Sequence, residues 1–338
     1  MKPPQKAATL HDVATHSGVS YQTVSRVVNN HPSVAEATRN RVLRSIEALK
    51  YRPNRAARSL VTNRSDTLAI MSFGSTFYGP AQMLANITQY ARSKGYRVSP
   101  TTIEQLTRDD VRAALDDLHE HLIDGVILIA PVVSDVMSEV NELAGRIPYI
   151  QIDTAPRPGV ASIGIEQVYG TQLAVNHLID LGHRRIAEIS GPLNWYDAIM
   201  RHRSWVSTMD RHTLRHDMTV EGNWTAESGY NGVLSLLNDG AEFTALVAGN
   251  DQMALGAIAA LHEHGLNVPD DVSVVGFDDI PESAYFLPAL TTVHQDFKLL
   301  GEQSIELLIS LIRNPEMPIH QRVLYPDLIV RGSTAPAR

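Results

Sequence analysis

The N-terminal end of the chain contains the stretch Val13-Ala-Thr-His-Ser-Gly-Val-Ser-Tyr-Gln-Thr-Val-Ser-Arg-Val-Val-Asn29. This pattern predicts two short helices joined by a tight turn. Gly18 permits the turn, and the Ser20 hydroxyl is placed to cap the second helix. Ala14 and Val19 are small and apolar where the two helices must touch. The stretch therefore has the pattern of a helix-turn-helix.

Three polar side chains lie near the exposed start of the second predicted helix. Tyr21, Gln22 and Arg26 occupy the positions from which a recognition helix contacts base edges in the major groove of DNA. Amphipathic helix pairs with a glycine in the turn also occur in many helical domains. On spacing alone, the pattern leaves a DNA reader and a purely structural helix pair open.

The charge distribution favours the DNA reader. Residues 1–64 hold 11 lysines and arginines against three acidic residues, a net charge of +8. The remaining residues hold 18 against 34, a net charge of −16, so the overall value of −8 conceals a basic end on an acidic body. Such asymmetry is expected of a protein that contacts phosphates with one end only.

Composition bounds the class of protein. A chain of 338 residues, 43% of them hydrophobic, is long enough for two or three domains. It has no cysteine, which excludes disulfides and thiolate chemistry and fits a reducing cytoplasm. Neither an apolar leader behind the first residues nor a run of about 18 apolar residues is present. We expect a cytoplasmic protein that is neither exported nor bound to a membrane.

The rest of the basic end predicts a third helix and a short connecting segment. The third helix is expected to begin near residues 34–36 and to run to Leu49, with Ser33 and Glu36 forming a capping box. Pro53 then ends the helix. The segment Asn54–Leu60 makes barely two helical turns, too few to be stable alone in water. By itself this segment is consistent either with a solvated linker or with a helix that folds only when it packs against a partner.

From Thr67 onward, apolar runs alternate with amphipathic stretches. The predicted strands are 67–73, 125–129, 148–152, 162–165, 186–190, 245–248 and 273–277. Amphipathic segments such as 170–181 and 253–264 lie between them and end in Gly182 and Gly265, which are typical C-cap residues. This rhythm predicts an α/β body of parallel sheets with helices on both faces.

Several long motifs, in order along the chain, resemble the lactose-repressor/galactose-repressor family of bacterial transcription regulators. The motifs are Tyr21-Gln-Thr-Val-Ser-Arg-Val-Val-Asn29, Tyr51-x-Pro53-Asn-Arg-Ala-Ala57, Asn250-Asp-Gln-Met-Ala-Leu-Gly-Ala257, Ser273-Val-Val-Gly-Phe-Asp-Asp279 and Gln295-Asp-Phe-x-Leu-Leu-Gly301. The resemblance implies a helix-turn-helix head (1–53), a hinge (54–65) and a periplasmic-binding-protein-like body. The body would consist of two doubly wound subdomains, 66–165 with 294–324 and 166–293 with 325–338.

The resemblance also implies how the protein contacts DNA. The hinge would form a helix in the minor groove, with Leu60 as the wedge between central base pairs and Ala57 beside it. Two heads of a homodimer would read the two halves of a palindromic operator. No leucine heptads follow Val330, so we expect a dimer and no larger assembly. The residues expected to contact DNA are Thr9, Ser20, Tyr21, Gln22, Thr23, Ser25, Arg26, Asn29, Asn54, Ala57 and Leu60.

Polar residues that follow apolar strands indicate a ligand site in the body. Asp153, Asn250 and Asp278 each come at or just after a predicted strand, and ligands of open α/β sheets bind beyond the carboxyl ends of strands. Carboxylates and amides can each hold two neighbouring hydroxyls, and a flat aromatic ring can cover the apolar face of a sugar. The sequence therefore favours a polyhydroxylated ligand.

By resemblance, Arg201, Trp224, Asn250, Asp278 and Gln295 occupy effector-binding positions, with Asp153 and Phe297 in support. Arg201 and Asp278 would bind ring hydroxyls, Asn250 a further hydroxyl, and Trp224 would stack on the ring. Where a sugar-responsive member of the family carries small hydroxyl or amide side chains, this chain has Phe73, Ile129, Trp195 and Asp197. We expect a sugar or glycoside inducer in a reshaped pocket, since each buried ligand hydroxyl left unpaired costs about 1–3 kcal/mol.

Three other classes compete with this interpretation. An enzyme is disfavoured because the chain has no dinucleotide or P-loop motif and no cysteine nucleophile, and its His-x-His pairs lack metal-ligand spacing; no cofactor or metal is expected. A periplasmic sugar-binding protein would need a signal peptide. A relative that responds to a purine or phosphorylated corepressor stays open, although Trp224 and Asn250 favour a sugar.

Overall fold

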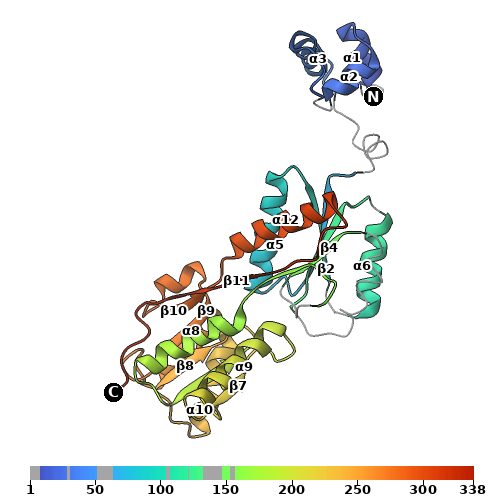
Figure 1. Ribbon diagram of the computed structural model, residues 1–338. Coiled ribbons are helices and arrows are strands. Elements are labelled where there is room, and N and C mark those ends of the chain that lie inside the picture. Colours follow the sequence, from blue (N-terminus) through green and yellow to red (C-terminus); the bar gives the residue numbers. More distant parts are fainter. Residues whose placement is uncertain are drawn as a thin grey trace, which may run out of the picture. The chain divides into compact units, whose positions relative to one another are not determined.

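The computed structural model describes residues 8–28, 31–51, 64–103, 107–120, 122–131, 147–152 and 157–338 (Figure 1). The chain divides into two compact units, residues 1–65 and 66–338. Each unit has its own hydrophobic core, as expected for a chain of this length.

The first unit is the predicted helix-turn-helix with a third helix packed against it. Its helices are α1 (Leu10–Ser17), α2 (Tyr21–Val28) and α3 (Glu36–Ala48). Gly18 adopts φ +63°, in the left-handed region that the turn requires. The Ser20 hydroxyl accepts from the backbone N–H of Thr23 at 3.2 Å, so the predicted cap is confirmed. A small core holds the helices together and consists of Val13, Ala14, Val24, Val27, Val42 and Tyr51.

The start of α3 differs from the sequence prediction. The N-cap residue is Ala35, which makes no side-chain cap hydrogen bond, and Ser33 hydrogen-bonds to Nδ1 of His31 at 2.8 Å. The helix begins at Glu36, two residues too late for Ser33 to serve as its cap. The predicted capping box between Ser33 and Glu36 is therefore wrong.

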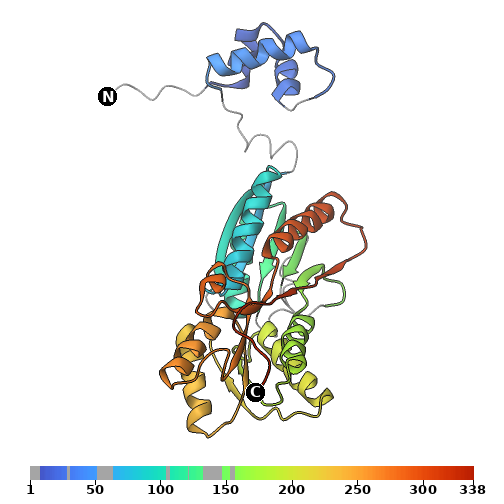
Figure 2. The ribbon, with the colours of Figure 1, turned by 90° about the vertical axis from the view of Figure 1, so that its left-hand side faces the viewer.

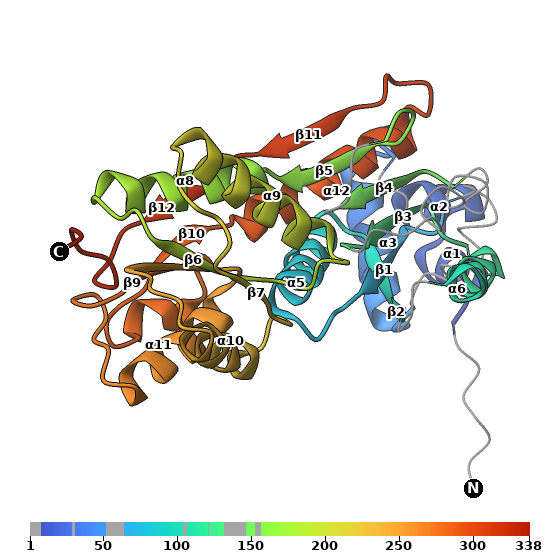
Figure 3. The same ribbon diagram turned by 90° about the horizontal axis from the view of Figure 1, so that it is seen from below.

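The second unit contains two six-stranded sheets (Figure 3). The sheet of the N-terminal lobe has the order β11-β5-β4-β3-β1-β2, and that of the C-terminal lobe has the order β12-β10-β9-β8-β6-β7. All strand pairs are parallel except β10 with β12. The strands are β1 (Thr67–Phe73), β2 (Arg97–Ile103), β3 (Gly125–Ile129), β4 (Tyr149–Ile152), β5 (Ser162–Ile165), β6 (Ile186–Ser190), β7 (Thr219–Glu221), β8 (Ala245–Ala248), β9 (Ser273–Asp278), β10 (Thr291–His294), β11 (Gln321–Leu324) and β12 (Asp327–Ile329).

Helices cover both faces of each sheet. They are α5 (Tyr78–Ser93), α6 (Arg108–Glu120), α8 (Gln167–Asp180), α9 (Tyr196–Arg211), α10 (Ala226–Asn238), α11 (Asp251–Glu263), α12 (Phe297–Arg313) and the 3-10 helix η1 (Pro281–Tyr285). In the C-terminal lobe, α10 and α11 pack on one face and α8 and α9 on the other (Figure 2). Strands buried on both faces need apolar residues on both, which explains why the sequence shows continuous apolar runs.

The chain passes between the lobes three times. It crosses between β5 and α8, between β10 and α12, and between β11 and β12. The seven predicted strands are all present, with bounds that differ by one residue at most. The sequence missed β2, β7, β10, β11 and β12, which are mostly short or edge strands.

Candidate functional site

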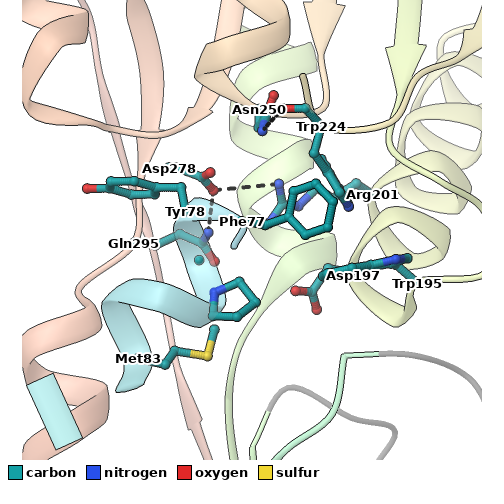
Figure 4. A pocket seen from close by; sticks show the side chains of 12 residues that line it. Phe77, Tyr78, Met83, Trp195, Asp197, Arg201, Trp224, Asn250, Asp278 and Gln295 are labelled. Carbon is teal, nitrogen blue, oxygen red and sulfur yellow. Dashed lines mark hydrogen bonds and ion pairs between the residues drawn. The ribbon is translucent and has the colours of Figure 1, made fainter. Parts of the chain in front are cut away.

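A pocket lies between the two lobes, at the carboxyl ends of their strands (Figure 4). The empty space between its lining side chains, part of it open to solvent, amounts to about 380 Å³. The lining residues are Phe77, Tyr78, Gly79, Pro80, Met83, Trp195, Asp197, Arg201, Trp224, Asn250, Asp278 and Gln295. The first five come from the N-terminal lobe.

The polar side of the pocket is built around one carboxylate. Asp278 is the last residue of β9, and its Oδ1 accepts from Nε2 of Gln295 at 2.6 Å. Nη1 of Arg201, from α9, lies 3.7 Å from the same oxygen. All three side chains are buried. The carboxylate is thus compensated on Oδ1, while its Oδ2 has no hydrogen-bond partner within the part of the chain that the structure describes.

Arg201 is fixed from several directions. Its Nε donates to Oε1 of Gln167 at 2.8 Å and its Nη1 to the carbonyl oxygen of Gly249 at 2.5 Å. The guanidinium group lies 3.7 Å from the ring centre of Phe277 and 5.5 Å from that of Trp224. An arginine held by hydrogen bonds and by stacking loses little further entropy when it binds a ligand.

Asn250 caps a helix and can still form hydrogen bonds with a ligand. It is the N-cap of α11: its Oδ1 accepts from the backbone N–H of Met253 at 2.9 Å, and its Nδ2 donates to the carbonyl oxygen of Trp224 at 3.1 Å. A primary amide has two donor hydrogens and two acceptor lone pairs. One donor and one acceptor position of Asn250 therefore remain for a ligand.

Burial raises the pKa of Asp278 to about 6, against the opposing effects of Arg201 and of the hydrogen bond from Gln295. Burial also raises the pKa of the neighbouring Asp251 well above its ordinary range, and the charge of Asp278 adds to this shift. Asp251 accepts from Thr292 and from the backbone N–H of Ile280. It supports the pocket wall from behind.

Aromatic rings from both lobes also line the pocket. Trp195 lies 5.2 Å from Phe77 in an edge-to-face arrangement and 5.9 Å from both Phe73 and Trp224. Trp224 packs directly over Gly191, where a Cβ atom would lie 2.1 Å from the indole ring. Trp224 can therefore pack here only because residue 191 has no side chain.

Two lining residues have strained backbones. Trp224 adopts φ +71° and Asp278 adopts φ +108°, a region that side chains other than glycine rarely occupy. Such outliers cost about 1–3 kcal/mol each and concentrate at functional sites. The strain at both positions supports a binding role for this pocket.

The structure brings most of the predicted effector residues together. Trp195, Asp197, Arg201, Trp224, Asn250, Asp278 and Gln295 line the pocket. Phe73 and Phe297 lie behind the lining, against Trp195 and Tyr78 respectively, and Ile129 is buried in the N-terminal core. Asp153 lies outside the described residues.

Sequence reasoning missed the lining contributed by Phe77, Tyr78, Gly79, Pro80 and Met83. These residues follow β1, so the rule that ligands bind beyond strand ends applies to them as it does to Asp278. Four of the five have no polar side-chain atom, so the pattern of a polar residue after an apolar strand does not single them out. The aromatic pair Phe77-Tyr78 so soon after a strand was the available signal.

On the first unit, Tyr21, Gln22 and Arg26 are exposed on α2. The exposed fraction of Tyr21 is 45%, and its ring lies 4.8 Å from that of His11. Thr23 and Ser25 are partly exposed, and Thr9 forms a capping box with Asp12 at the start of α1. Asn29, Asn54, Ala57 and Leu60 lie outside the described residues. An exposed α2 surface with a basic residue is the surface that a DNA reader requires.

Comparison with known proteins identifies the family. Residues 9–54 match the family described as "Bacterial regulatory proteins, lacI family", and residues 175–334 match a "Periplasmic binding protein-like domain". The chain is 36% identical to the lactose operon repressor of Escherichia coli K12, over 97% of this chain and 91% of the relative. The chain belongs to the lacI family of bacterial regulatory proteins. It is a DNA-binding repressor with an effector-binding domain, and not an enzyme.

Other transcription regulators match over similar lengths. The HTH-type transcriptional repressor PurR of Haemophilus influenzae is 33% identical over 96% of this chain and 98% of its own. The structure of a lac repressor dimer bound to operator and to the anti-inducer ONPF superimposes with a TM-score of 0.90, at 35% identity, over 98% of this chain and 100% of that one. A complex of the regulator CelR with cellobiose superimposes with a TM-score of 0.72, at 29% identity, over 96% and 99% of the two chains.

Two further findings concern the described residues only. None of their helices is long and apolar enough to cross a membrane. No group of three or more histidine, aspartate or glutamate side chains among them could hold a metal ion.

Proposed function

We propose that the protein represses a carbohydrate-utilisation operon and leaves its operator when a sugar or glycoside binds in the pocket between the lobes. One observation carries the proposal: Arg201, Asn250 and Asp278 line one pocket together with several aromatic rings, among them Trp195 and Trp224. Hydroxyl groups of a sugar would pair with the polar side, and the apolar face of its ring would lie against an indole.

The relatives support both a sugar and a second candidate. The lactose operon repressor and the CelR–cellobiose complex favour a saccharide. PurR relatives and the large aromatic share of the lining favour a purine corepressor, because a base can stack on an indole as well as a sugar can. The fixed polar set, with only one guanidinium and two carboxylates in the lining, matches hydroxyl groups better than phosphate.

On DNA we propose a homodimer in the cytoplasm whose two heads read the halves of a palindromic operator. Asn54, Ala57 and Leu60 would belong to a hinge, and the body would divide at residues 66–165 with 294–324 and 166–293 with 325–338. Arg26→Ala should relax specificity at one base pair of each half-site, since a bidentate contact to guanine contributes about 1–3 kcal/mol of discrimination. Uniform weakening across all sequences would identify Arg26 as a phosphate contact instead.

The deciding experiment combines a thermal-shift screen with operator titration. Monosaccharides, cellobiose, isopropyl thiogalactoside and purine bases are screened against the full-length protein, and any ligand that stabilises it is added to an operator-binding assay. We expect a saccharide to raise the melting temperature and to weaken operator binding. A purine that tightens operator binding, with no response to any saccharide, would replace the sugar by a corepressor.

A further inference from the structure

Gln167, a residue that does not line the pocket, links two of the buried polar side chains that do, Arg201 and Gln295. This side chain is the first residue of α8 and is only 2% exposed. Its Oε1 accepts from Nε of Arg201 at 2.8 Å, and its Nε2 donates to Oε1 of Gln295 at 3.1 Å. Gln295 in turn donates to Oδ1 of Asp278 at 2.6 Å. The four side chains form a closed polar ring, because Arg201 and Asp278 also face each other at 3.7 Å.

The direction of this hydrogen-bond chain is fixed. Arginine has donors only, so the atom of Gln167 that faces Arg201 must be the amide oxygen. The amide nitrogen of Gln167 must then donate to Gln295, which must present its own nitrogen to Asp278. Every donor points toward the carboxylate, and such chains strengthen each link by polarisation. A substitution of Gln167 should therefore alter the hydrogen bonding of Asp278 through Gln295.

Gln167 also joins two of the three connections between the lobes. It directly follows the crossing from β5 to α8, and Gln295 lies within the crossing from β10 to α12. The two residues are 128 positions apart in sequence, and the 3.1 Å hydrogen bond between their side chains links the two crossings. A ligand that moves Arg201 or Asp278 thus acts on both crossings.

We propose that Gln167 is a positioning residue of the effector site: it orients Arg201 and Gln295 toward the ligand and transmits ligand binding to the connections between the lobes. This inference rests on the proposed function for the identity of the ligand, but not for the coupling of the two crossings. A merely structural glutamine would stabilise α8 without affecting the segment that contains Gln295.

Two substitutions of Gln167 distinguish its hydrogen bond with Arg201 from its hydrogen bond with Gln295. Gln167→Leu removes both hydrogen bonds at similar volume. Gln167→Glu keeps an acceptor for Arg201 but cannot donate to Gln295; if Gln295 flips to restore that bond, it presents its carbonyl oxygen to Asp278, so the chain is broken in either orientation. Gln89→Leu, on the exposed side of α5, is the matched control for a Gln→Leu change.

Hydrogen–deuterium exchange of the ligand-free, full-length protein tests the coupling. We expect both Gln167 variants to exchange severalfold faster in residues 291–300 as well as around α8, with no change in Gln89→Leu. Gln167→Glu should retain slower exchange in α9 than Gln167→Leu, since Arg201 keeps its partner. Unchanged exchange at 291–300 in both variants would overturn the coupling, whatever happens near α8.

Calorimetry with cellobiose and isopropyl thiogalactoside tests positioning. If the wild-type protein binds either compound, both Gln167 variants should bind it about tenfold more weakly, which corresponds to about 1.4 kcal/mol, while Gln89→Leu binds it normally. Binding within twofold of the wild type would refute the positioning role. If the wild type binds neither compound, the proposed saccharide is wrong. The exchange experiment still tests whether Gln167 couples the two crossings.

Discussion

The two walls of the pocket are built on different principles. The C-terminal lobe and the crossing after β10 supply the directional groups Arg201, Asn250, Asp278 and Gln295. Three of them lie where a strand ends or a helix begins, Arg201 lies in the second turn of α9, and the rings of Trp195 and Trp224 belong to the same wall. The N-terminal lobe supplies one short, nearly continuous apolar segment, residues 77–83. The first wall can specify which hydroxyl groups are recognised. Apart from the Tyr78 hydroxyl, the described residues of the second wall offer shape and apolar contact, so changes in the two walls should have different consequences.

The largest effect is expected from Arg201→Leu, which removes the cation of the polar wall. Asp278 would then be buried without its charged partner, and breaking such a pair costs about 3–5 kcal/mol of folding stability. Saccharide binding should be lost altogether. Urea denaturation and calorimetry measure the two effects. Arg203→Leu, an exposed neighbour on α9, serves as control, and equal behaviour of the two variants would contradict the distinct role of the polar wall.

The folding stability of the ligand-free protein should depend on pH because of Asp278, which belongs to the same wall. The pKa of Asp278 is about 6 in the folded protein, above the ordinary value of 3.8 for an aspartate. Between about pH 4 and pH 6 the folded state therefore binds more protons than the unfolded state, and stability falls as the pH rises through this window. The difference of about two pKa units corresponds to about 3 kcal/mol.

Asp278→Asn removes this contribution together with the part of the raised pKa of Asp251 that the charge of Asp278 causes. Asp217, Asp271 and Glu306 have lowered pKa values because of their hydrogen-bond partners, and they act in the opposite sense. The gap in unfolding free energy between the wild type and Asp278→Asn should therefore change by about 2 kcal/mol between pH 4.5 and pH 7, most of the total of about 3 kcal/mol. A gap that is independent of pH would show that Asp278 titrates normally.

The difference between the walls also explains what the sequence could predict. Asn250 and Asp278 were found because polar residues follow apolar runs there and because both lie in motifs that resemble the family, although Asn250 also caps α11. Phe77 and Met83 were missed because an apolar residue near a helix start is compatible with any core. The strands β10 and β12 were missed for a related reason: in a strand of three or four residues, partners far along the chain, and not local pattern, decide the conformation.

Contacts between aromatic rings and glycines lay beyond sequence reasoning for the same physical reason. Nothing near Gly191 in the chain indicates that Trp224 packs over it, 33 positions later. Likewise, Gly74 leaves room for Trp195, whose ring lies 2.5 Å from the position of the missing Cβ. The sequence identifies the tryptophans, but only the fold shows what makes room for them.

Gly191→Ala should have the next largest effect, because the new methyl group would lie 2.1 Å from the indole of Trp224. The ring must move, and such overpacking typically costs about 1–3 kcal/mol. Saccharide affinity should fall by about tenfold or more if Trp224 stacks on the ligand. Gly79→Ala is the matched control on the apolar wall, since its methyl group would meet only Phe297, at 3.8 Å. Equal losses from both glycines would remove the distinction between the walls.

The smallest effect is expected from Phe77→Leu in the apolar wall. Leucine retains most of the apolar volume but loses the edge-to-face contact with Trp195 at 5.2 Å, an interaction that contributes about 0.5–1.5 kcal/mol. Stability should fall by that amount. Affinity for an unsubstituted sugar should change less than affinity for a glycoside with an apolar aglycone, because Phe77 offers the ligand no hydrogen bond. If an unsubstituted sugar loses as much affinity as a glycoside, Phe77 positions the polar wall as well, and the two walls act as one unit.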